Sequence, residues 1–316
     1  MKDGYGRKLD YLRISVTDKC DMRCRYCMPE EGIRHLSHGD VLSFEEIVRI
    51  AGIMKDLGIK KIRLTGGEPL VRRGITELIG MLPCDVYLTT NGCRLADMAR
   101  QLAAAGLRAV NVSLDSLDAD TFFGITGIKG PGSVLAGIEA AKSAGLPVKL
   151  NCVPIRGINE NEIEKLCEYA ESIGSDIRFI ELMPIGCGSG FEGVPSDEIK
   201  DRLQDRFGKA EEAGSDDTGP AVYYRFGSNK QKTGFISPMT HRFCSSCNRI
   251  RMTAEGFLKL CLQYPAGIDL RALLRSGADD ATIRNAIADA VLQKPVSHNM
   301  GRGSGSDDRK MIQIGG

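Results

Sequence analysis

Two sets of three cysteines are the residues of this sequence whose type and spacing best suit metal chemistry. The first triplet has the pattern CxxxCxxC, and the second has CxxC followed by one further cysteine; their members are Cys20, Cys24, Cys27, Cys244, Cys247 and Cys261. Three thiolates at the first spacing can bind three irons of a [4Fe-4S] cluster and leave the fourth iron open to a small molecule. Two incomplete triplets in one chain therefore predict two [4Fe-4S] clusters with an open iron each.

Zinc is the alternative at both triplets, because cysteine and histidine are its usual structural ligands. His35 or His38 could complete a zinc site at the first triplet, and His241 could complete a zinc ribbon at the second. The other five cysteines share no common spacing; they are Cys84, Cys93, Cys152, Cys167 and Cys187. Most are expected to be small buried apolar residues, and Cys187 is expected to be a thiol in a loop.

Two further motifs carry residues suited to binding. Gly66-Gly67-Glu68-Pro69 follows an expected strand; glycines there let backbone approach a ligand closely, and Glu68 can accept hydrogen bonds from an ammonium group. The same four residues could also form an ordinary turn. Arg249 and Arg251 stand two apart on an expected strand, so their side chains share a face, either toward a ligand or on an exposed polar edge.

A repeating strand-then-helix pattern must position these motifs. Six β-branched, apolar runs predict strands, and they are 11–16, 60–65, 85–90, 108–114, 148–153 and 176–183. Amphipathic stretches at 43–57, 95–105, 133–144 and 159–173 predict helices between them; the first opens with the capping box Ser43-Phe44-Glu45-Glu46. This rhythm predicts an α/β fold, a partial (βα)6 barrel of the TIM type, with its sites at the carboxyl ends of the strands.

The rhythm stops after Met183, where a Gly-rich loop, one helix, short hairpin-like strands and two terminal helices are expected. We therefore expect two domains: a core barrel over residues 5–182 and an α+β module over 183–316 that covers the open barrel and carries the second triplet. The last segment, GRGSGSDDRKMIQIGG, has the composition of a flexible stretch with a short apolar end.

Composition restricts the partners. With 42 basic and 41 acidic residues, the net charge of +1 argues against nucleic acid or an anionic membrane as the main partner. The N-terminus has no apolar signal region, and no run approaches the roughly 20 apolar residues of a membrane span. We expect a cytoplasmic protein, in which eleven cysteines indicate metal or redox chemistry rather than disulfides.

Together these motifs resemble a known family. CxxxCxxC after the first strand, followed by GGEP after the second, is similar to the radical S-adenosylmethionine superfamily. More narrowly, LRISVTDKCDMRCRYCMP, RLTGGEPLVR, TTNG, NVSLDSLD, FIELMPIG, GFISPMTHRFCSSCNRIRMTAEGFLKLCL and the terminal Ile-Gly-Gly resemble the GTP 3′,8-cyclases of molybdenum-cofactor biosynthesis. The resemblance runs from about residue 10 to the C-terminus.

The resemblance implies a lyase that converts GTP to (8S)-3′,8-cyclo-7,8-dihydroguanosine 5′-triphosphate. The first triplet would hold the cluster that binds and cleaves S-adenosylmethionine; the 5′-deoxyadenosyl radical would take hydrogen from C3′ of GTP, and the ribose radical would attack guanine C8. Contacts to S-adenosylmethionine would come from Tyr26, Gly66, Gly67, Glu68, Ser113 and Met183.

The resemblance also implies how GTP is held and reduced. Contacts to GTP would come from Arg13, Arg63, Thr89, Lys149, Arg249, Ile250 and Arg251. The second triplet would hold the cluster that binds guanine, and catalytic roles would fall to Arg249, Arg251, Gly315 and Gly316, the two glycines entering the active site. An electron donor such as flavodoxin or ferredoxin, the downstream cyclic pyranopterin monophosphate synthase and a homodimer are the implied partners.

Two other functions compete. A radical enzyme that matures a peptide would explain both triplets but neither the Arg249/Arg251 strand nor the Gly-Gly end. A zinc module that shapes a nucleic-acid surface would need a basic stripe, which the sequence lacks. Brown protein with about eight irons per chain would favour clusters, and colourless zinc protein would favour the module.

Overall fold

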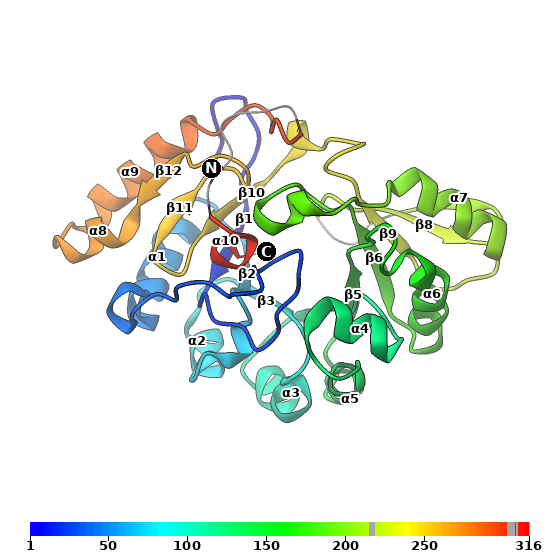
Figure 1. Cartoon of the computed structure of the whole chain (residues 1–316). Coiled ribbons are helices and arrows are strands. Elements are labelled where there is room, and N and C mark those ends of the chain that lie inside the picture. Colours follow the sequence, from blue (N-terminus) through cyan, green and yellow to red (C-terminus); the bar gives the residue numbers. More distant parts are fainter. Residues whose placement is uncertain (215–218, 302–306, 308, 316) are drawn as a thin grey trace.

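The computed structural model describes residues 1–214, 219–301, 307 and 309–315. Within them the strands form one twelve-stranded sheet, in the order β12-β11-β10-β1-β2-β3-β4-β5-β6-β9-β8-β7. The sheet is mostly parallel, which confirms the α/β class. Figure 1 shows it curving, with helices outside and the C-terminal helix α10 near its centre.

The six expected strands form the centre of the sheet, in chain order and parallel to one another. They are β1 (Tyr11–Ser15), β2 (Lys61–Thr65), β3 (Asp85–Thr90), β4 (Ala109–Ser113), β5 (Val148–Cys152) and β6 (Asp176–Ile180). Parallel strands end at the same edge, so the loops that follow them come together. The cysteine and GGEP motifs, which follow β1 and β2, are thereby neighbours.

Helices connect these strands, and most lie where the sequence predicts them. They are α1 (Phe44–Asp56), α2 (Ile75–Met81), α3 (Leu95–Ala104), α4 (Ala119–Thr126), α5 (Gly132–Ser143) and α6 (Ile163–Ser172), with short helices η1 (His38–Asp40), η2 (Pro69–Val71) and η3 (Glu160–Glu162). The predicted capping box is present: Ser43 accepts from the Glu46 N–H, and Glu46 accepts from the Ser43 N–H. The helix expected from residue 159 begins at Ile163, because η3 precedes it.

The C-terminal part extends the sheet at both edges. Its elements are η4 (Gly186–Gly190), α7 (Ser196–Phe207), β7 (Ala210–Ala213), β8 (Val222–Phe226), β9 (Thr233–Ile236), η5 (Cys244–Ser246), β10 (Arg249–Met252), β11 (Phe257–Lys259), β12 (Gly267–Asp269), α8 (Leu270–Arg275), α9 (Asp280–Leu292) and α10 (Met311–Ile314). β10 pairs in parallel with β1, and β9 pairs in parallel with β6. We expected hairpin-like strands in a smaller module; in the structure they continue the central sheet and pair with the backbone groups that β1 and β6 would otherwise leave open.

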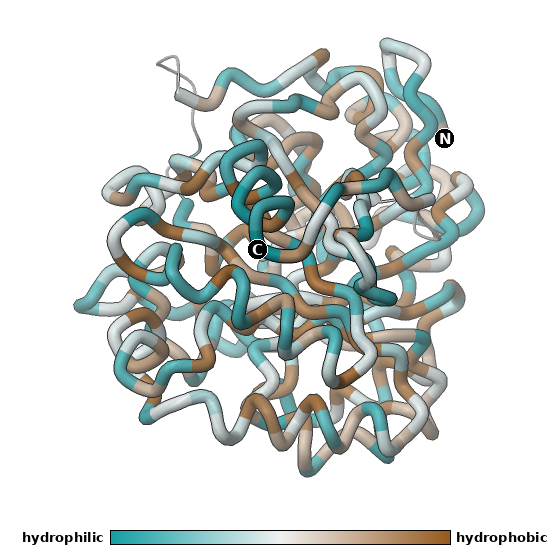
Figure 2. The backbone as a smooth tube through the Cα atoms, turned by 90° about the vertical axis from the view of Figure 1, so that its right-hand side faces the viewer, coloured by the Kyte–Doolittle hydropathy of each residue, from teal (hydrophilic) through white to brown (hydrophobic). Residues whose placement is uncertain are grey.

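Apolar side chains of the parallel strands and the facing helix sides form one large core, which includes Leu12, Leu64, Leu88, Val112 and Phe179. Figure 2 shows hydrophobic and hydrophilic residues interleaved along the helices, as expected for helices that pack one face on a sheet. A second, smaller cluster joins Ile185, Leu262, Met300 and Ile314. This smaller cluster connects the Gly-rich loop, the second triplet and the C-terminal helix.

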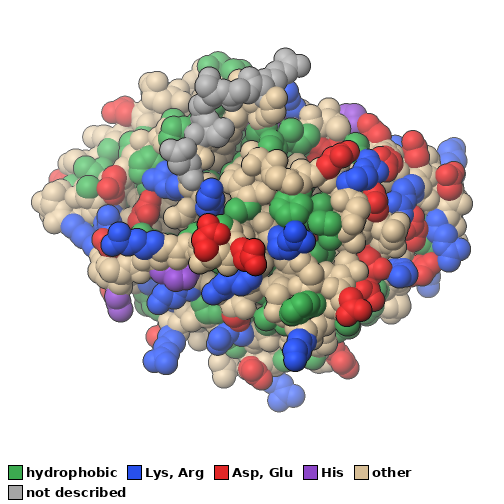
Figure 3. Space-filling model, viewed as in Figure 1, with side chains coloured by type: hydrophobic (Ala, Val, Ile, Leu, Met, Phe, Trp, Pro, Cys, Tyr) green, Lys and Arg blue, Asp and Glu red, His purple; other side chains and the backbone are tan. Residues whose placement is uncertain are grey.

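The surface carries both signs of charge. On the face shown in Figure 3, lysine and arginine side chains are interspersed with aspartate and glutamate, in keeping with the net charge of +1. Among the described residues, no helix combines the length and apolar character that crossing a bilayer requires.

Candidate active site

One cavity at the carboxyl ends of the central strands contains both cysteine triplets. Its volume is about 350 Å³, and all six triplet cysteines line it together with Arg13, Arg249, Arg251 and Glu68. The triplets are more than 200 residues apart in sequence, and the pairing of β10 with β1 brings them to the same cavity. The structure therefore gathers the predicted metal ligands and most predicted contacts at one site.

The loop after β1 holds the first triplet. The N–H groups of Arg23 and Arg25 donate to the carbonyls of Thr126 and Ile125 at the end of α4, at 2.8 and 3.0 Å. These bonds fix the loop against the sheet's carboxyl edge, so that Cys20, Cys24 and Cys27 face the cavity.

Burial dominates the chemistry of the first-triplet thiols. It raises the pKa of Cys20 to about 11 and that of Cys27 to about 12, and it raises the pKa of Cys24 well above its usual value. Carboxylates add to this effect: Glu68 and Asp21 act on Cys20, and Asp115 acts on Cys24 and Cys27. The first triplet thus lies in surroundings that disfavour further negative charge.

Gly66 and Gly67 are required by the cysteine loop itself. A Cβ on Gly66 would lie 2.7 Å from the Thr17 carbonyl oxygen, and one on Gly67 would lie 2.3 Å from that of Lys19. The Gly67 N–H donates to Thr17 at 2.7 Å, and the Glu68 N–H donates to Lys19 at 2.8 Å. The sequence suggested that these glycines make room for a ligand; here they make room for the segment that leads into the first triplet.

Glu68 is held rigidly beside the first triplet. Its carboxylate accepts from the Leu70 N–H at 2.9 Å, the Thr90 hydroxyl at 2.8 Å and the Asn91 N–H at 2.6 Å. Burial nevertheless raises its pKa from 4.5 to about 7. A buried carboxylate so oriented can receive a cationic group that enters the cavity.

The remaining predicted cofactor contacts also line the cavity. The Tyr26 hydroxyl donates to Asp115 Oδ2 at 2.7 Å, and Asp115 Oδ1 accepts from the Val153 N–H at 2.8 Å. Ser113 ends β4, and Met183 follows β6 and packs on the smaller apolar cluster. All three predicted residues, Tyr26, Ser113 and Met183, therefore face the place where the first triplet lies.

Arginines form a row across three adjacent strands. Arg13 on β1 stands in register with Arg251 on β10 at one side and with Arg63 on β2 at the other. Neighbouring strands are about 4.8 Å apart, and like charges directly opposite each other repel. Burial lowers the pKa of Arg13 and of Arg251, and the neighbouring guanidinium groups lower them further. This concentration of positive charge on the cavity wall suits a polyanionic ligand.

The other predicted substrate contacts separate into three cases. Thr89 lines the same cavity, and its buried Oγ1 has no hydrogen-bond partner in the described part of the chain. Lys149 instead lines a second cavity of about 490 Å³ at the opposite ends of the strands, which shares Arg63 and Asn111 with the first. The Ile250 side chain lies in the apolar core, so only its backbone could contact a substrate.

The second triplet lies in cationic surroundings. Cys244 is in η5, Cys247 precedes β10, and Cys261 follows β11. Burial opposes ionisation of the Cys247 thiol, but Lys294 and then Arg249 outweigh it and lower its pKa to about 7. The two triplets therefore differ in electrostatic environment although both line one cavity.

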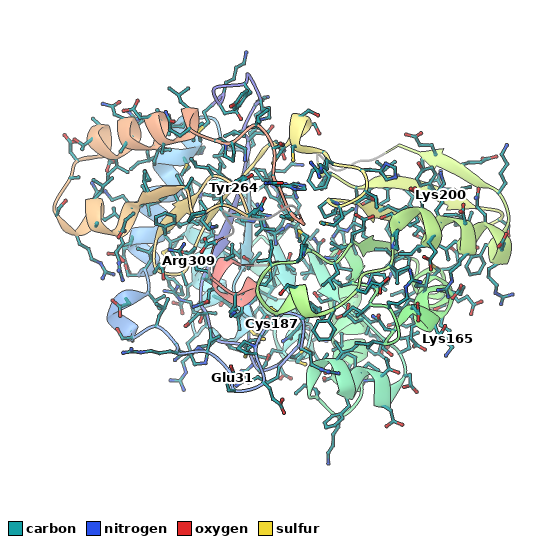
Figure 4. The ribbon with its side chains drawn as sticks, turned by 45° about the horizontal axis from the view of Figure 1, so that its top comes forward. Glu31, Lys165, Cys187, Lys200, Tyr264 and Arg309 are labelled. Carbon is teal, nitrogen blue, oxygen red and sulfur yellow. The ribbon has the colours of Figure 1, made fainter. Side chains whose placement is uncertain are left out.

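The chain's C-terminal segment enters the site. Gly315 has a φ of +82°, and a Cβ there would lie 2.7 Å from Thr65 Oγ1 and 3.0 Å from Ser15 Cβ. The Ile312 N–H hydrogen-bonds the Cys27 thiol. In Figure 4, Arg309 and Cys187 lie on either side of α10. Gly316, also predicted to act here, lies outside the described residues.

Two of the three histidines proposed for zinc sites, His35 and His241, contact carboxylates instead, and the third, His38, lies exposed in η1. His35 Nδ1 lies 3.3 Å from Asp18 Oδ2, and His241 Nε2 lies 2.8 Å from Asp197 Oδ2. In the described part of the chain, no three histidine, cysteine, aspartate or glutamate side chains gather as a site for a single metal ion.

Two residues at the site, Arg178 and Lys294, were not predicted from the sequence. Arg178 on β6 is 5% exposed, lines the cavity, and donates from Nε to Asn151 Oδ1 at 2.9 Å. Its alternation with the apolar residues of DIRFI was the available signal, since an arginine in a central parallel strand must face something polar. Lys294, which follows α9, had no such signal.

Two family models match this chain, and together they cover most of its length. Residues 14–170 match the family model described as the Radical SAM superfamily, and residues 175–300 match the model Molybdenum Cofactor Synthesis C. The structure of Streptococcus suis SuiB bound to S-adenosylmethionine is similar in fold, with a TM-score of 0.64 at 15% identity over 88% of this chain and 68% of that one. This chain therefore belongs to the class of radical S-adenosylmethionine enzymes.

Curated relatives define the family. The GTP 3′,8-cyclase of Thermodesulfovibrio yellowstonii is 46% identical over 93% of this chain and 94% of its own length. That of Peptoclostridium acidaminophilum is 45% identical over 99% and 98%, and that of Paracoccus denitrificans is 46% identical over 94% and 89%. The chain belongs to the GTP 3′,8-cyclase family, which confirms the resemblance seen in its motifs.

Proposed function

We propose that this protein converts GTP to (8S)-3′,8-cyclo-7,8-dihydroguanosine 5′-triphosphate in the first step of molybdenum-cofactor biosynthesis. The observation that carries the proposal is that two cysteine triplets and a row of arginines line one cavity. A radical generator and a polyanionic nucleotide need such groups within reach of each other.

The first triplet fits a [4Fe-4S] cluster with S-adenosylmethionine. Three thiols face the cavity, and the loop that carries them is fixed by Gly66, Gly67 and α4. When bound, the reduced cluster would supply the one electron that cleaves S-adenosylmethionine to methionine and a 5′-deoxyadenosyl radical. Glu68 would accept from the methionine ammonium, while Tyr26, Ser113 and Met183 would orient the cofactor in the cavity.

GTP is proposed to lie between the triplets with its phosphates toward the arginine row. Arg13, Arg63 and Arg251 would neutralise the triphosphate, because planar guanidinium groups suit phosphate oxygens. Thr89 would use its buried Oγ1 on the substrate. Lys149 would meet the end of the triphosphate through the region that the two cavities share.

The second triplet is proposed to hold a further [4Fe-4S] cluster whose open iron binds guanine. The donor set fits: Cys244, Cys247 and Cys261 are three thiols that line the cavity, His241 pairs with Asp197, and the surroundings lower the pKa of Cys247. Arg249 and Arg251 would hold the nucleotide next to this centre, with Ile250 contributing backbone only. Gly315, and Gly316 beyond it, would close the cavity from the side of Ser15 and Thr65.

The wider arrangement belongs to the same proposal. Residues 5–182 would form a partial (βα)6 barrel of the TIM type and residues 183–316 the module that completes it. A flavodoxin or ferredoxin would donate electrons, and cyclic pyranopterin monophosphate synthase would take the product. We also propose a homodimer and a cytoplasmic location; eleven free cysteines support a reducing compartment.

The test is anaerobic incubation of the iron-reconstituted protein with GTP, S-adenosylmethionine and dithionite, followed by mass analysis. The expected result is a cyclised nucleotide and 5′-deoxyadenosine in equal amounts, with deoxyadenosine formation dependent on GTP. Formation of equal amounts of 5′-deoxyadenosine with and without GTP would contradict the assignment of GTP as the substrate. A wild-type iron content of about four per chain, rather than about eight, would contradict the second cluster alone.

A further inference from the structure

Lys294 is a buried lysine that joins the two segments of the second triplet. It follows α9 and is 3% exposed. Its Nζ donates to the carbonyl oxygen of Arg249 at 3.0 Å and to that of Leu260. The first carbonyl is two residues after Cys247, and the second directly precedes Cys261. One ammonium group thus holds together the two segments that carry these thiols.

The charge of Lys294 is not cancelled by these contacts, since both acceptors are neutral carbonyl groups. Lys259 provides the contrast: it is 0% exposed, but its Nζ pairs with the Asp307 carboxylate. Burial lowers the pKa of Lys294, whereas the thiols of Cys247 and Cys261 raise it. Because its two carbonyl partners lie two residues after Cys247 and directly before Cys261, the ammonium charge is held beside the chain segments that carry both thiols.

The first triplet has the opposite surroundings. The carboxylates of Glu68 and Asp115 line the cavity with its thiols, and Asn91 Nδ2 donates to both Asp21 Oδ1 at 2.7 Å and Cys20 Sγ at 3.9 Å. A cluster gains one negative charge when it takes up an electron, so nearby cations favour its reduced form and nearby anions disfavour it. The same cavity would then hold a centre that releases electrons readily and one that retains them.

We propose that Lys294 is a positioning residue of the second triplet that also raises the reduction potential of the cluster bound there. This inference rests on the proposed function in one respect, the presence of a [4Fe-4S] cluster on Cys244, Cys247 and Cys261. It concerns the equilibrium between the oxidised cluster and the cluster reduced by one electron, for which dithionite supplies the electron in the test.

The experiment uses the full chain with Cys20, Cys24 and Cys27 all replaced by serine, so that only the second centre is titrated. Reconstituted protein is titrated with dithionite and monitored by electron paramagnetic resonance. Lys294→Gln, which can still donate a hydrogen bond but carries no charge, should lower the reduction equilibrium constant at least tenfold, about 59 mV for one electron. Lys294→Arg should stay within threefold of the parent.

Lys165→Met is the matched control, because it removes one lysine charge from α6, which packs beside β6, six strands along the sheet from β10. Its reduction equilibrium should be unchanged. Full iron content in Lys294→Gln with an unchanged potential would overturn the inference and leave the second cluster standing. A parent protein that binds zinc instead of iron would overturn both.

The arginine variant keeps the inference open to refutation if the neutral variant loses its cluster. Lys294→Arg with full iron content and a reduction equilibrium constant lowered about tenfold, as expected for Lys294→Gln, would contradict a role for the charge. A purely structural role predicts changes in iron content or in the free energy of unfolding, and no change in potential.

Discussion

Replacing Gly315 by alanine is expected to remove nearly all of the cyclised product while leaving the iron content of the protein unchanged. Two costs oppose the docked position of the C-terminal segment in this variant. At a φ of +82° an L side chain costs about 1–2 kcal/mol. The added Cβ would also meet Thr65 Oγ1 at 2.7 Å and Ser15 Cβ at 3.0 Å, and overpacking of this kind costs about 1–3 kcal/mol.

The two costs together reach about 2–5 kcal/mol, which lowers the docked population relative to the undocked one by about thirtyfold to several thousandfold. The assay measures cyclised nucleotide, 5′-deoxyadenosine and iron content in one anaerobic reaction. Product should fall by at least about thirtyfold. Iron should stay at the wild-type level, because none of the six proposed ligands is touched.

Gly106→Ala is the matched control, since Gly106 has a φ of +92° and nothing lies within 4 Å of the added Cβ. It carries the backbone cost at a place remote from chemistry, and should change the free energy of unfolding but not turnover per folded enzyme. Adding Thr65→Ala to Gly315→Ala removes the nearest atom and should restore part of the activity. Wild-type turnover by Gly315→Ala would refute the docking argument.

Three further changes test other parts of the site. Arg13→Met should weaken GTP binding at least tenfold, by about 1.5–3 kcal/mol, because one cation of the arginine row is lost. Calorimetry would measure the affinity, with the exposed Arg108→Met as the control variant. An affinity for GTP equal to that of wild type would contradict the assignment of Arg13 to the phosphates. In the folded protein the pKa of Glu68 is raised from 4.5 to about 7. The contribution of its protonated form to the free energy of unfolding is therefore complete below pH 4.5 and is lost as the pH rises to about 7. Urea unfolding of iron-free protein should show that the free energy of unfolding falls by about 3 kcal/mol over this pH range, and Glu68→Gln should abolish this pH dependence. The same pH dependence in wild type and Glu68→Gln would contradict the assignment to Glu68. Asp307→Asn breaks the buried pair with Lys259 and should expose the chain before α10 to trypsin; protection equal to wild type would show that the pair does not anchor this segment.

The central fold could be predicted because its signals are local. Each strand from β1 to β6 is a short run of β-branched and apolar residues, and strand-then-helix units leave a parallel sheet as the regular solution. Helix ends were also local: Ser43 and Glu46 cap α1, and Gly145, with a φ of +78°, follows α5. The start of α6 was placed too early because η3 carries helical composition without α-helical hydrogen bonding.

The edges of the sheet could not be predicted in the same way. β9 and β10 are short, and nothing in TGFI or RIRM says which strand they join. Their partners are set by the backbone groups that β6 and β1 leave open, which is a property of the assembled sheet. The pairing of β10 with β1 matters most, because it places Arg251 beside Arg13 and completes the arginine row.

The same limit applies to the chemistry of the two triplets. Spacing identifies six thiols, and it treats them alike. The structure separates them through residues that are remote in sequence: Glu68 and Asp115 act on the first triplet, whereas Lys294 and Arg249 act on the second. A lysine after a helix, as in LQKPV, is usually solvent-exposed, and only the carbonyls of Arg249 and Leu260 explain why this one is buried. Which of the two proposed centres would hold an electron more tightly is therefore set by tertiary structure, whereas the cysteine pattern alone predicts iron binding.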